Sequence, residues 1–446
     1  MAERNGLTRG DRRRNNRIAV LRQVVTVGRA VLAIDLGEDK QVAVLVDHDG
    51  RVLGRRVMRV KVHRLGAVLV WAAVQAARRG FTQVVVGCEP TGHRWRAVMQ
   101  LADEAGMGFV CVQSLQVHRA RESDDYTRDK TDHKDAVLIG RLIVRLDCYL
   151  PERADADWAR LRHLGQRRER LLTQIGAIRQ QITDLLSCCW PTVLGCAGKP
   201  LDSSTWLACL AAVTSRDAPR AGWDRDTLVA AAHPQLAGFG ARRLAPRRIV
   251  EGFVQAITHP GGVSEQRPGA IERVGFLLTD WRNAARALGE VEQRMTGVLD
   301  ALGLSTLVSS IPGVTVVGAA AILAETGDPS RFACARGLVK HAGLNPAENT
   351  SATFQGQSRL SRRGRPRLRL AAWRAVWGAL PHNPVLHARF THLTHREHNR
   401  LSTGQAHAAC AATLLRWLHA ITTSRRPFDI NLATGTTRRQ RLHTAA

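Results

Sequence analysis

The alternation of apolar and polar positions predicts a regular series of strands and helices in the first third of the chain. Apolar runs at 31–37 (VLAIDLG) and 82–89 (TQVVVGCE) are typical of buried strands. QVAVLVD and RVLGRRVMRV, joined by the turn HDG, predict two more strands in a meander with the first. GFVCVQ predicts a fifth strand, and helical spacing follows at 65–79, at 93–105 and after Asp132.

The order of these elements indicates a fold class. Three strands are followed by a helix, a strand, a helix, a strand and a helix, which is the order of an RNase H-like domain. We therefore predict an α/β RNase H-like N-terminal domain.

Two long helical patterns follow that domain. Residues 158–186 carry apolar positions near heptad spacing, and residues 271–302 could return antiparallel to them. The pattern fits a coiled-coil arm that dimerises, and it fits equally a packing of the two helices within one chain. The segment 199–274 between them is rich in Gly, Pro and Arg, and its pattern predicts no function.

The C-terminal part is predicted to be mainly α-helical. Within SIPGVTVVGAAAILAETGD, a turn at Gly313 precedes a helix of small residues, which resembles a helix-hairpin-helix element. Backbone N–H groups at such a turn can hold a DNA phosphate, so Gly313 is a candidate nucleic-acid contact. A Pro-Gly turn between packed helices is the alternative interpretation.

These patterns predict five regions. They are a basic N-terminal arm (1–28), an RNase H-like domain (29–150), a coiled-coil or dimerisation region with an insertion at about 199–274 (151–303), a mainly α-helical C-terminal domain (304–425) and a basic tail (426–446).

The charge of the chain narrows the class of partner. Its 446 residues include 65 Lys and Arg against 38 Asp and Glu, a formal charge of +27. Because arginine clusters occur along the whole chain, we expect a large surface that follows a nucleic-acid backbone. The densest cluster, SRLSRRGRPRLRL, supplies five candidate contacts: Arg359, Arg362, Arg363, Arg365 and Arg367.

Other compositional features point to a cytosolic protein. No stretch reaches the roughly 18 apolar residues that a membrane helix needs, so no membrane partner is expected. The nine cysteines are odd in number and lack paired CxxC spacing, which favours reduced thiols in a cytosol.

Four acidic residues are the candidate metal ligands. Asp35 lies in the first strand, Glu89 ends the fourth, and Asp132 and Asp135 share one face of the helix that follows. Carboxylates brought together from separate elements repel one another unless a cation neutralises them, and oxygen ligands suit Mg²⁺ or Mn²⁺. An alternative interpretation makes Asp132 the helix N-cap and puts Asp135 at the third helical position, where it favours the helix dipole. The two roles are compatible.

The acidic motifs resemble a known family. AIDLGEDK, GCEPTGHRW and KTDHKDA are similar to the three acidic motifs of the DEDD insertion-sequence transposases, described as bridge-RNA-guided recombinases. The segment 309–364 is similar to the C-terminal transposase domain of that family. The resemblance implies a resolvase-like domain that binds magnesium through Asp35, Glu89, Asp132 and Asp135.

The resemblance also implies a serine that forms a covalent link to DNA. It corresponds best to Ser351, although this chain has Ser-Ala where the family usually has Ser-Gly, so Thr350 and Ser358 are rivals. A serine hydroxyl needs activation by a base or metal, which a composite site from two domains, drawn from two subunits, would provide. The implied partners are donor and target DNA, a guide RNA and further copies of the chain, as a dimer or tetramer, at the bacterial nucleoid.

Three functions therefore compete. The first is a transposase that cuts and rejoins DNA through Ser351 with metal assistance and RNA guidance. The second is a junction resolvase or nuclease in which the same carboxylates activate water. The third is a nucleic-acid-binding protein whose acidic residues only stabilise helices.

Overall fold

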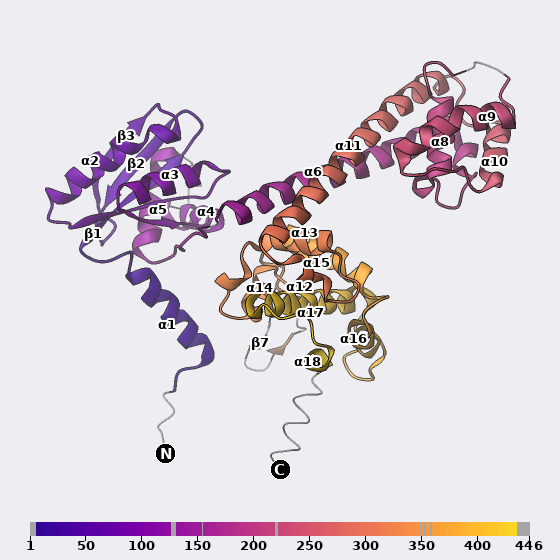
Figure 1. Ribbon diagram of the computed structural model, residues 1–446. Helices are drawn as coiled ribbons and strands as arrows, with labels where there is room; N and C mark the ends of the chain where they lie inside the picture. The colour runs from indigo at the N-terminus through magenta and orange to yellow at the C-terminus, as the bar shows by residue number, and fades with distance from the viewer. Residues whose placement is uncertain are drawn as a thin grey trace, which may run out of the picture. The chain divides into compact units, whose positions relative to one another are not determined.

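The computed structural model describes residues 6–125, 131–153, 155–218, 222–347, 350–351, 354–356 and 359–434. The chain forms two compact units, Met1–Arg153 and Ala154–Ala446, which are described one at a time (Figure 1).

The N-terminal unit is built on a mixed sheet of five strands. These are β1 (Arg29–Leu36), β2 (Gln41–Val46), β3 (Val52–Met58), β4 (Gln83–Cys88) and β5 (Gly108–Cys111). Their order is β3-β2-β1-β4-β5, in which β1, β2 and β3 pair antiparallel while β4 and β5 run parallel to β1. The five predicted strands are confirmed, and the mixed α/β architecture is consistent with an RNase H-like domain.

Helices cover both faces of this sheet. They are α1 (Arg9–Arg22), α2 (Gly66–Ala77), α3 (Arg94–Glu104), α4 (Ser114–Asp125) and α5 (Asp132–Val144), with a 3₁₀ turn at Val62–Arg64. Leu32 and Ile34 of β1 pack with α2 and α3 on one face. Val31 and Ala33 pack with α4, α5 and the end of α1 on the other. This alternation follows from the two-residue period of a strand. The helices α1 and α4 were not predicted from the sequence.

Two glycines let α5 lie close to the sheet. A Cβ atom on Gly87 of β4 would come within 2.4 Å of Ile143 Cδ1 in α5. A Cβ on Gly140 of α5 would meet Val46 at 3.1 Å and Ala33 at 3.4 Å. The small residues therefore fix α5 against β1 and β4, the strands that carry two of the candidate carboxylates.

The cap of α5 differs from the sequence prediction. Thr131, not Asp132, is the N-cap, and its side chain accepts a hydrogen bond from the Lys134 N–H at 3.2 Å. Asp132 is the first helical residue and Asp135 the fourth. The assignment of Asp132 as cap was wrong by one residue because threonine caps by the same side-chain oxygen chemistry as aspartate.

The second unit contains the two long helices, α6 (Ala156–Cys189) and α11 (Arg267–Ala301). They pack antiparallel: Leu161 of α6 shares a core with Val298 of α11, and Ile182 shares another with Val274. Arg168 donates to Glu292 at 2.8 Å between the two cores. The helices thus pack within one chain, and a dimerising coiled coil stays a prediction.

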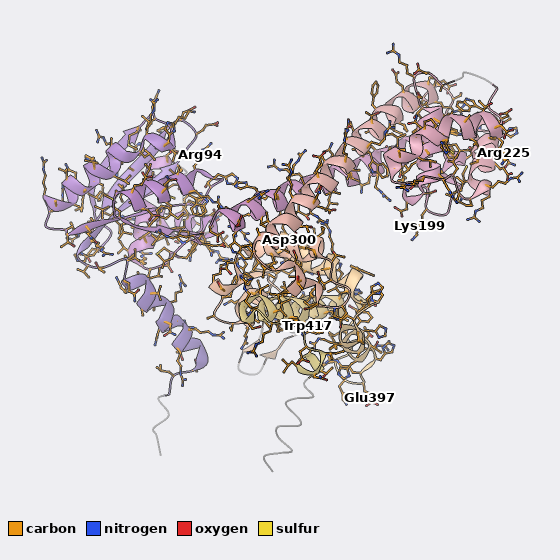
Figure 2. The ribbon with its side chains drawn as sticks, viewed as in Figure 1. Arg94, Lys199, Arg225, Asp300, Glu397 and Trp417 are labelled. Atoms are coloured by element: carbon orange, nitrogen blue, oxygen red, sulfur yellow. The ribbon has the colours of Figure 1, made fainter. Side chains whose placement is uncertain are left out.

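A small helical cluster occupies the segment between α6 and α11. It contains α7 (Pro191–Leu194), α8 (Ser204–Val213), α9 (Arg225–Ala232) and α10 (Arg247–Thr258), with 3₁₀ turns at Pro200–Asp202 and His233–Phe239. Trp190 and Trp206 are fully buried, and their indole N–H groups donate to backbone carbonyls at 2.8 Å. Lys199 and Arg225 lie on its surface (Figure 2). The segment without a predicted function therefore has its own core.

The C-terminal part is mainly helical, as predicted. Its helices are α12 (Ser305–Ser309), α13 (Val316–Thr326), α14 (Ala335–His341), α15 (Pro366–Ala379), α16 (Pro384–His395), α17 (Thr403–Ser424) and α18 (Ile430–Thr434), with a 3₁₀ turn at Pro329–Arg331. Apolar faces of α13, α15 and α17 share one core with the adjoining ends of α6 and α11. Four short strands complete it: β6 (Pro346–Ala347), β7 (Thr350–Ser351), β8 (Phe354–Gln355) and β9 (Arg359–Leu360). β6 pairs with β9, and β7 pairs with β8.

Candidate active site

Two of the four candidate carboxylates lie side by side at one end of the sheet. β1 and β4 run parallel, with Ile34 opposite Cys88, so Asp35 and Glu89 come next on neighbouring strands. By strand alternation Asp35 follows Val31 and Ala33 on the face that α5 covers, and Glu89 directly follows β4 on the same side. The packing of α5 onto that face brings the start of α5 toward the pair.

Asp132, at the start of α5, has a cationic neighbour. Its Oδ2 lies 2.9 Å from Nζ of Lys40, which sits in the turn between β1 and β2. The two side chains are 49% and 45% exposed. An ion pair this exposed contributes little to stability, so Asp132 can exchange Lys40 for another cation at small cost.

Asp135 is held differently. It is 5% exposed, and both of its oxygens accept hydrogen bonds from Arg121 of α4, from Nε and from Nη2, each at 2.8 Å. Such a bidentate pair is the strongest arrangement between a carboxylate and an arginine. The pair connects α4 to α5 and neutralises Asp135 in the present arrangement.

The thiol of Cys88, the residue before Glu89, stays protonated. Cys88, next to Glu89, is fully buried, and a hydrogen bond with Cys111 together with burial raises the pKa of its thiol well above the usual value. The charges of Glu89 and Asp35 act in the same direction. By strand alternation Cys88 faces the α2 and α3 side of the sheet, away from the face of Asp35 and Glu89, so the donors at this edge are oxygens.

The fit of a divalent cation to these residues can be judged from the donor set. Across the described part of the chain, no three His, Cys, Asp or Glu side chains are grouped closely enough to hold a metal ion. Magnesium, however, is often bound by one or two carboxylates and completes its shell with water and phosphate oxygens. Asp35 and Glu89 suit that mode, Asp132 would join by leaving Lys40, and Asp135 would first have to leave Arg121.

The candidate nucleophile belongs to the C-terminal unit. Ser351 and Thr350 form β7, in which Ser351 lies opposite Phe354 of β8. Figure 1 shows β7 at the edge of the helical body rather than in its core. Ser358, the other rival, lies outside the described residues.

The five candidate arginines occupy two different environments. Arg359, Arg362, Arg363 and Arg367 are exposed, as a contact to nucleic acid requires. Arg365 is half-buried: its Nη1 donates to the Glu325 carbonyl at 2.8 Å and lies 3.5 Å from the Glu325 carboxylate. Arg365 therefore holds the C-terminal end of α13, where four carbonyls lack helical partners.

Gly313 is closely packed. Its φ is +76°, and a Cβ there would come within 2.8 Å of Ala379 Cα at the end of α15. The glycine is needed for both reasons. This close packing fits the alternative interpretation, a turn between packed helices. A phosphate contact of the Gly313 N–H stays a prediction.

Two residues of the site were missed by sequence reasoning. Lys40 and Arg121, the partners of Asp132 and Asp135, lie 92 and 14 positions away from them. A helix carrying Arg121 could have been predicted, since Val117 and Arg121 are four positions apart, as on one face of a helix. The place of Lys40 could not have been predicted, because only the fold brings it to α5.

Comparison with known proteins gives matches in both units of the chain. Residues 32–191, which include most of β1 together with β4 and α5, match the family model described as a transposase of the DEDD type of IS110. Residues 305–391 match the family described as transposase IS116/IS110/IS902. An IS110 insertion-element protein of Streptomyces coelicolor, described as an uncharacterized 43.6 kDa protein, is 28% identical over 296 residues, 64% of this chain and 69% of that protein.

Two separate matches to transposase families define the class of the protein as a transposase. The chain belongs to the IS110 family of insertion-sequence transposases, which makes it an enzyme that acts on DNA. Within the described residues, none of the helices combines the length and apolar character needed to cross a membrane.

Proposed function

We propose that this transposase cuts and rejoins DNA through a covalent bond to Ser351, assisted by Mg²⁺ or Mn²⁺ at Asp35, Glu89, Asp132 and Asp135. The observation that carries the proposal is the placement of Asp35 and Glu89 together beneath the start of α5. Oxygen donors meeting at the end of a sheet suit a hard divalent cation.

The chemistry balances without an external energy source. The Ser351 oxygen attacks phosphorus, one DNA oxygen leaves as a hydroxyl with the proton that the serine loses, and a phosphoserine link results. The hydroxyl of another strand then attacks the same phosphorus and releases the serine. A divalent cation, when bound, lowers the pKa of the attacking hydroxyl and stabilises charge on the phosphate.

The residues of this chain prepare that reaction. When no divalent cation is bound, Lys40 neutralises Asp132 and Arg121 neutralises Asp135. The exposed arginines Arg359, Arg362, Arg363 and Arg367, with Arg365 at the start of α15, bind the nucleic-acid backbone near the serine-bearing segment. The N–H of Gly313 contacts a phosphate at the other end of α15.

The wider setting is also part of the proposal. We expect donor and target DNA to be selected by a guide RNA encoded with the element, and the chain to act in the cytosol as a dimer or tetramer. A protein that delegates sequence recognition to RNA needs a large basic surface, which the net charge of +27 supplies.

A denaturing-gel search for a covalent protein–DNA adduct tests the mechanism. Wild type, Ser351→Ala, Asp132→Ala and the control Asp226→Ala, an exposed acid of the helical cluster, are incubated with donor and target DNA, Mg²⁺ and flanking RNA. We expect an adduct in wild type and control only. Cleavage by Ser351→Ala without an adduct in any lane would mean that water is the nucleophile, and the serine mechanism would be wrong.

A further inference from the structure

Helix α1, with six arginines and one aspartate, has the composition of a nucleic-acid-binding element. It begins with a capping box in which the Thr8 side chain accepts from the Asp11 N–H and the Asp11 carboxylate accepts from the Thr8 N–H. Residues 12–20 are all exposed, and the first buried side chain is Leu21. Figure 1 shows the helix leaving the sheet domain with only its C-terminal end against it.

Such a helix has little to stabilise it alone. An isolated helix of about 12–15 residues is marginal in water, and α1 has no apolar stripe beyond its last turn. The positive charge of α1 makes it complementary to a polyanion. We therefore expect nucleic acid, and not an apolar protein surface, to bind its exposed side.

The outward face of α1 has the residues of a major-groove reader. Arg12, Asn16 and Ala19 recur at helical intervals on the side opposite Leu21, with Asn15 beside them. Arginine pairs with guanine and asparagine with adenine at base edges, and the small alanine allows close approach. The major groove of B-DNA admits a helix, whereas that of A-form RNA is too narrow.

The inward face of α1 is anchored next to a second basic feature. Nη2 of Arg17 donates to the carbonyls of Leu146 and Cys148, at 3.2 and 3.1 Å. These residues directly follow the C-terminal end of α5. The helix therefore stands at a defined place on the domain.

A basic pocket lies at that end of α5. Its volume is about 320 Å³, and three arginines, Arg51, Arg141 and Arg145, line it together with one acid, Asp49 of the β2–β3 turn. Arg141 is paired with Asp124 at 3.2 Å, while Arg51 and Arg145 are exposed. Their positive charge suits a phosphate oxygen.

The pocket is distant from the candidate carboxylates. It borders the turn after β2, whose end pairs with Val31 near the beginning of β1, while Asp35 lies near the other end of β1. Along α5, Arg141 and Asp132 are nine residues apart, about 13 Å. A phosphate bound in the pocket is therefore not the phosphate at which Asp35 and Glu89 act.

We propose that α1 enters the major groove of duplex DNA through Arg12, Asn15 and Asn16, while Arg51 and Arg145 hold backbone phosphates of the same duplex. Helix α1 lies outside the residues that match the DEDD family model, which begin at 32, while the pocket lies within them. The inference rests on the proposed function only in taking DNA as the substrate, and it assigns the N-terminal unit a DNA-holding surface separate from its catalytic edge.

Binding of the full-length chain to a random-sequence DNA duplex, followed by fluorescence anisotropy over a range of salt concentrations, tests the inference. Arg12→Ala/Arg13→Ala and Arg51→Ala/Arg145→Ala are compared with Arg242→Ala/Arg243→Ala, which removes two exposed charges from the helical cluster. We expect each of the first two to weaken binding about tenfold or more. Arg51→Ala/Arg145→Ala, which removes two phosphate contacts, should also lower the salt slope by about 1.8, at 0.9 per contact. The control should bind as wild type.

If all three variants weaken DNA binding equally, net charge alone explains the effect and the inference is wrong. An equal loss on an RNA duplex would overturn the choice of DNA. Amide hydrogen exchange in α1 must slow when DNA is added, and unchanged exchange would also contradict docking. Adduct formation is measured separately. If the α1 variant binds DNA as wild type does, this inference is wrong and the serine mechanism is unaffected. If the α1 variant binds more weakly but wild type forms no adduct, the serine mechanism is wrong and this inference is unaffected.

Discussion

Arg121 and Asp135 form a bidentate pair between α4 and α5, with both donor–acceptor distances at 2.8 Å. Both side chains are largely buried. The charge of Asp135 is thus already balanced by a largely buried arginine within the protein. Asp135 positions α5, and with it Asp132, whether or not it also binds a metal.

Replacing Arg121 by alanine should destabilise the N-terminal unit by about 3 kcal/mol, because it leaves a buried carboxylate without a partner. The double variant Arg121→Ala/Asp135→Asn should recover much of that loss, since the buried charge is gone. Denaturant unfolding of the full chain measures both. If the double variant is no more stable than the single one, the unpaired charge is not the cause. Added Mg²⁺ should stabilise Arg121→Ala more than wild type if Asp135 is a ligand.

Asp35 and Glu89 should be needed for cleavage but not for DNA binding. Asp35→Asn or Glu89→Gln is expected to lower strand cleavage by at least about 100-fold, because metal assistance contributes several kcal/mol to the transition state. Binding should be unchanged or tighter, since a carboxylate that repels phosphate has been neutralised. Cleavage assays and anisotropy on the same preparations measure this, with Asp226→Asn as control. Cleavage at the wild-type level by either variant would remove that residue from the metal site.

Lys40 should compete with the metal for Asp132. Lys40→Met removes the charge and keeps the length of the side chain, so the Mg²⁺ concentration for half-maximal cleavage should fall by a few-fold. Stability should change by less than about 1 kcal/mol because the pair is half-exposed. Lys199→Met, an exposed lysine of the helical cluster, is the control. A rise in the magnesium requirement would show that Lys40 assists the reaction, for example by holding phosphate.

The strands and the order of the acidic residues were predictable because both depend on local pattern. VLAIDLG and TQVVVGCE alternate or run apolar over a strand's length, so β1 and β4 follow directly, and Asp35 and Glu89 with them. The identity of the cap was less certain, since Thr131 and Asp132 are adjacent and both cap well.

What could not be predicted depends on tertiary contacts. α1 has no apolar stripe, so hydrophobic periodicity gave no sign of a helix at Arg9–Arg22. In α4 few side chains are buried, Val117 among them. The pairing of Lys40 with Asp132 and of Arg121 with Asp135 arises only when α4, α5 and the β1–β2 turn come together.

His341 should make stability depend on pH. Burial, then the charges of Arg331, Arg365 and Arg162, lowers its pKa from 6.5 to about 4. The unfolded chain therefore binds a proton that the folded chain excludes, so stability is lost as pH falls from about 6.5 toward 4 and is fully present above that window. The shift corresponds to about 2 kcal/mol after allowance for partial exposure. His341→Gln should flatten the profile between pH 4 and 6.5, whereas the exposed His398→Gln should not. Parallel profiles for wild type and His341→Gln would contradict the assignment.

Two glycines of α6 should respond oppositely to the same substitution. A Cβ on Gly165 would lie 2.4 Å from Ala324 Cβ in α13, and neither a methyl group nor a helix backbone can move aside easily. Gly165→Ala should therefore destabilise the second unit by about 1–3 kcal/mol. Gly176, eleven residues along the same helix, has no heavy atom within 4 Å of its would-be Cβ. There alanine should stabilise by about 0.5–1 kcal/mol, because it restricts the unfolded chain and favours the helix. Thermal unfolding of the two variants gives the comparison, and changes of the same sign would mean that α6 and α13 do not approach as closely as these contacts require.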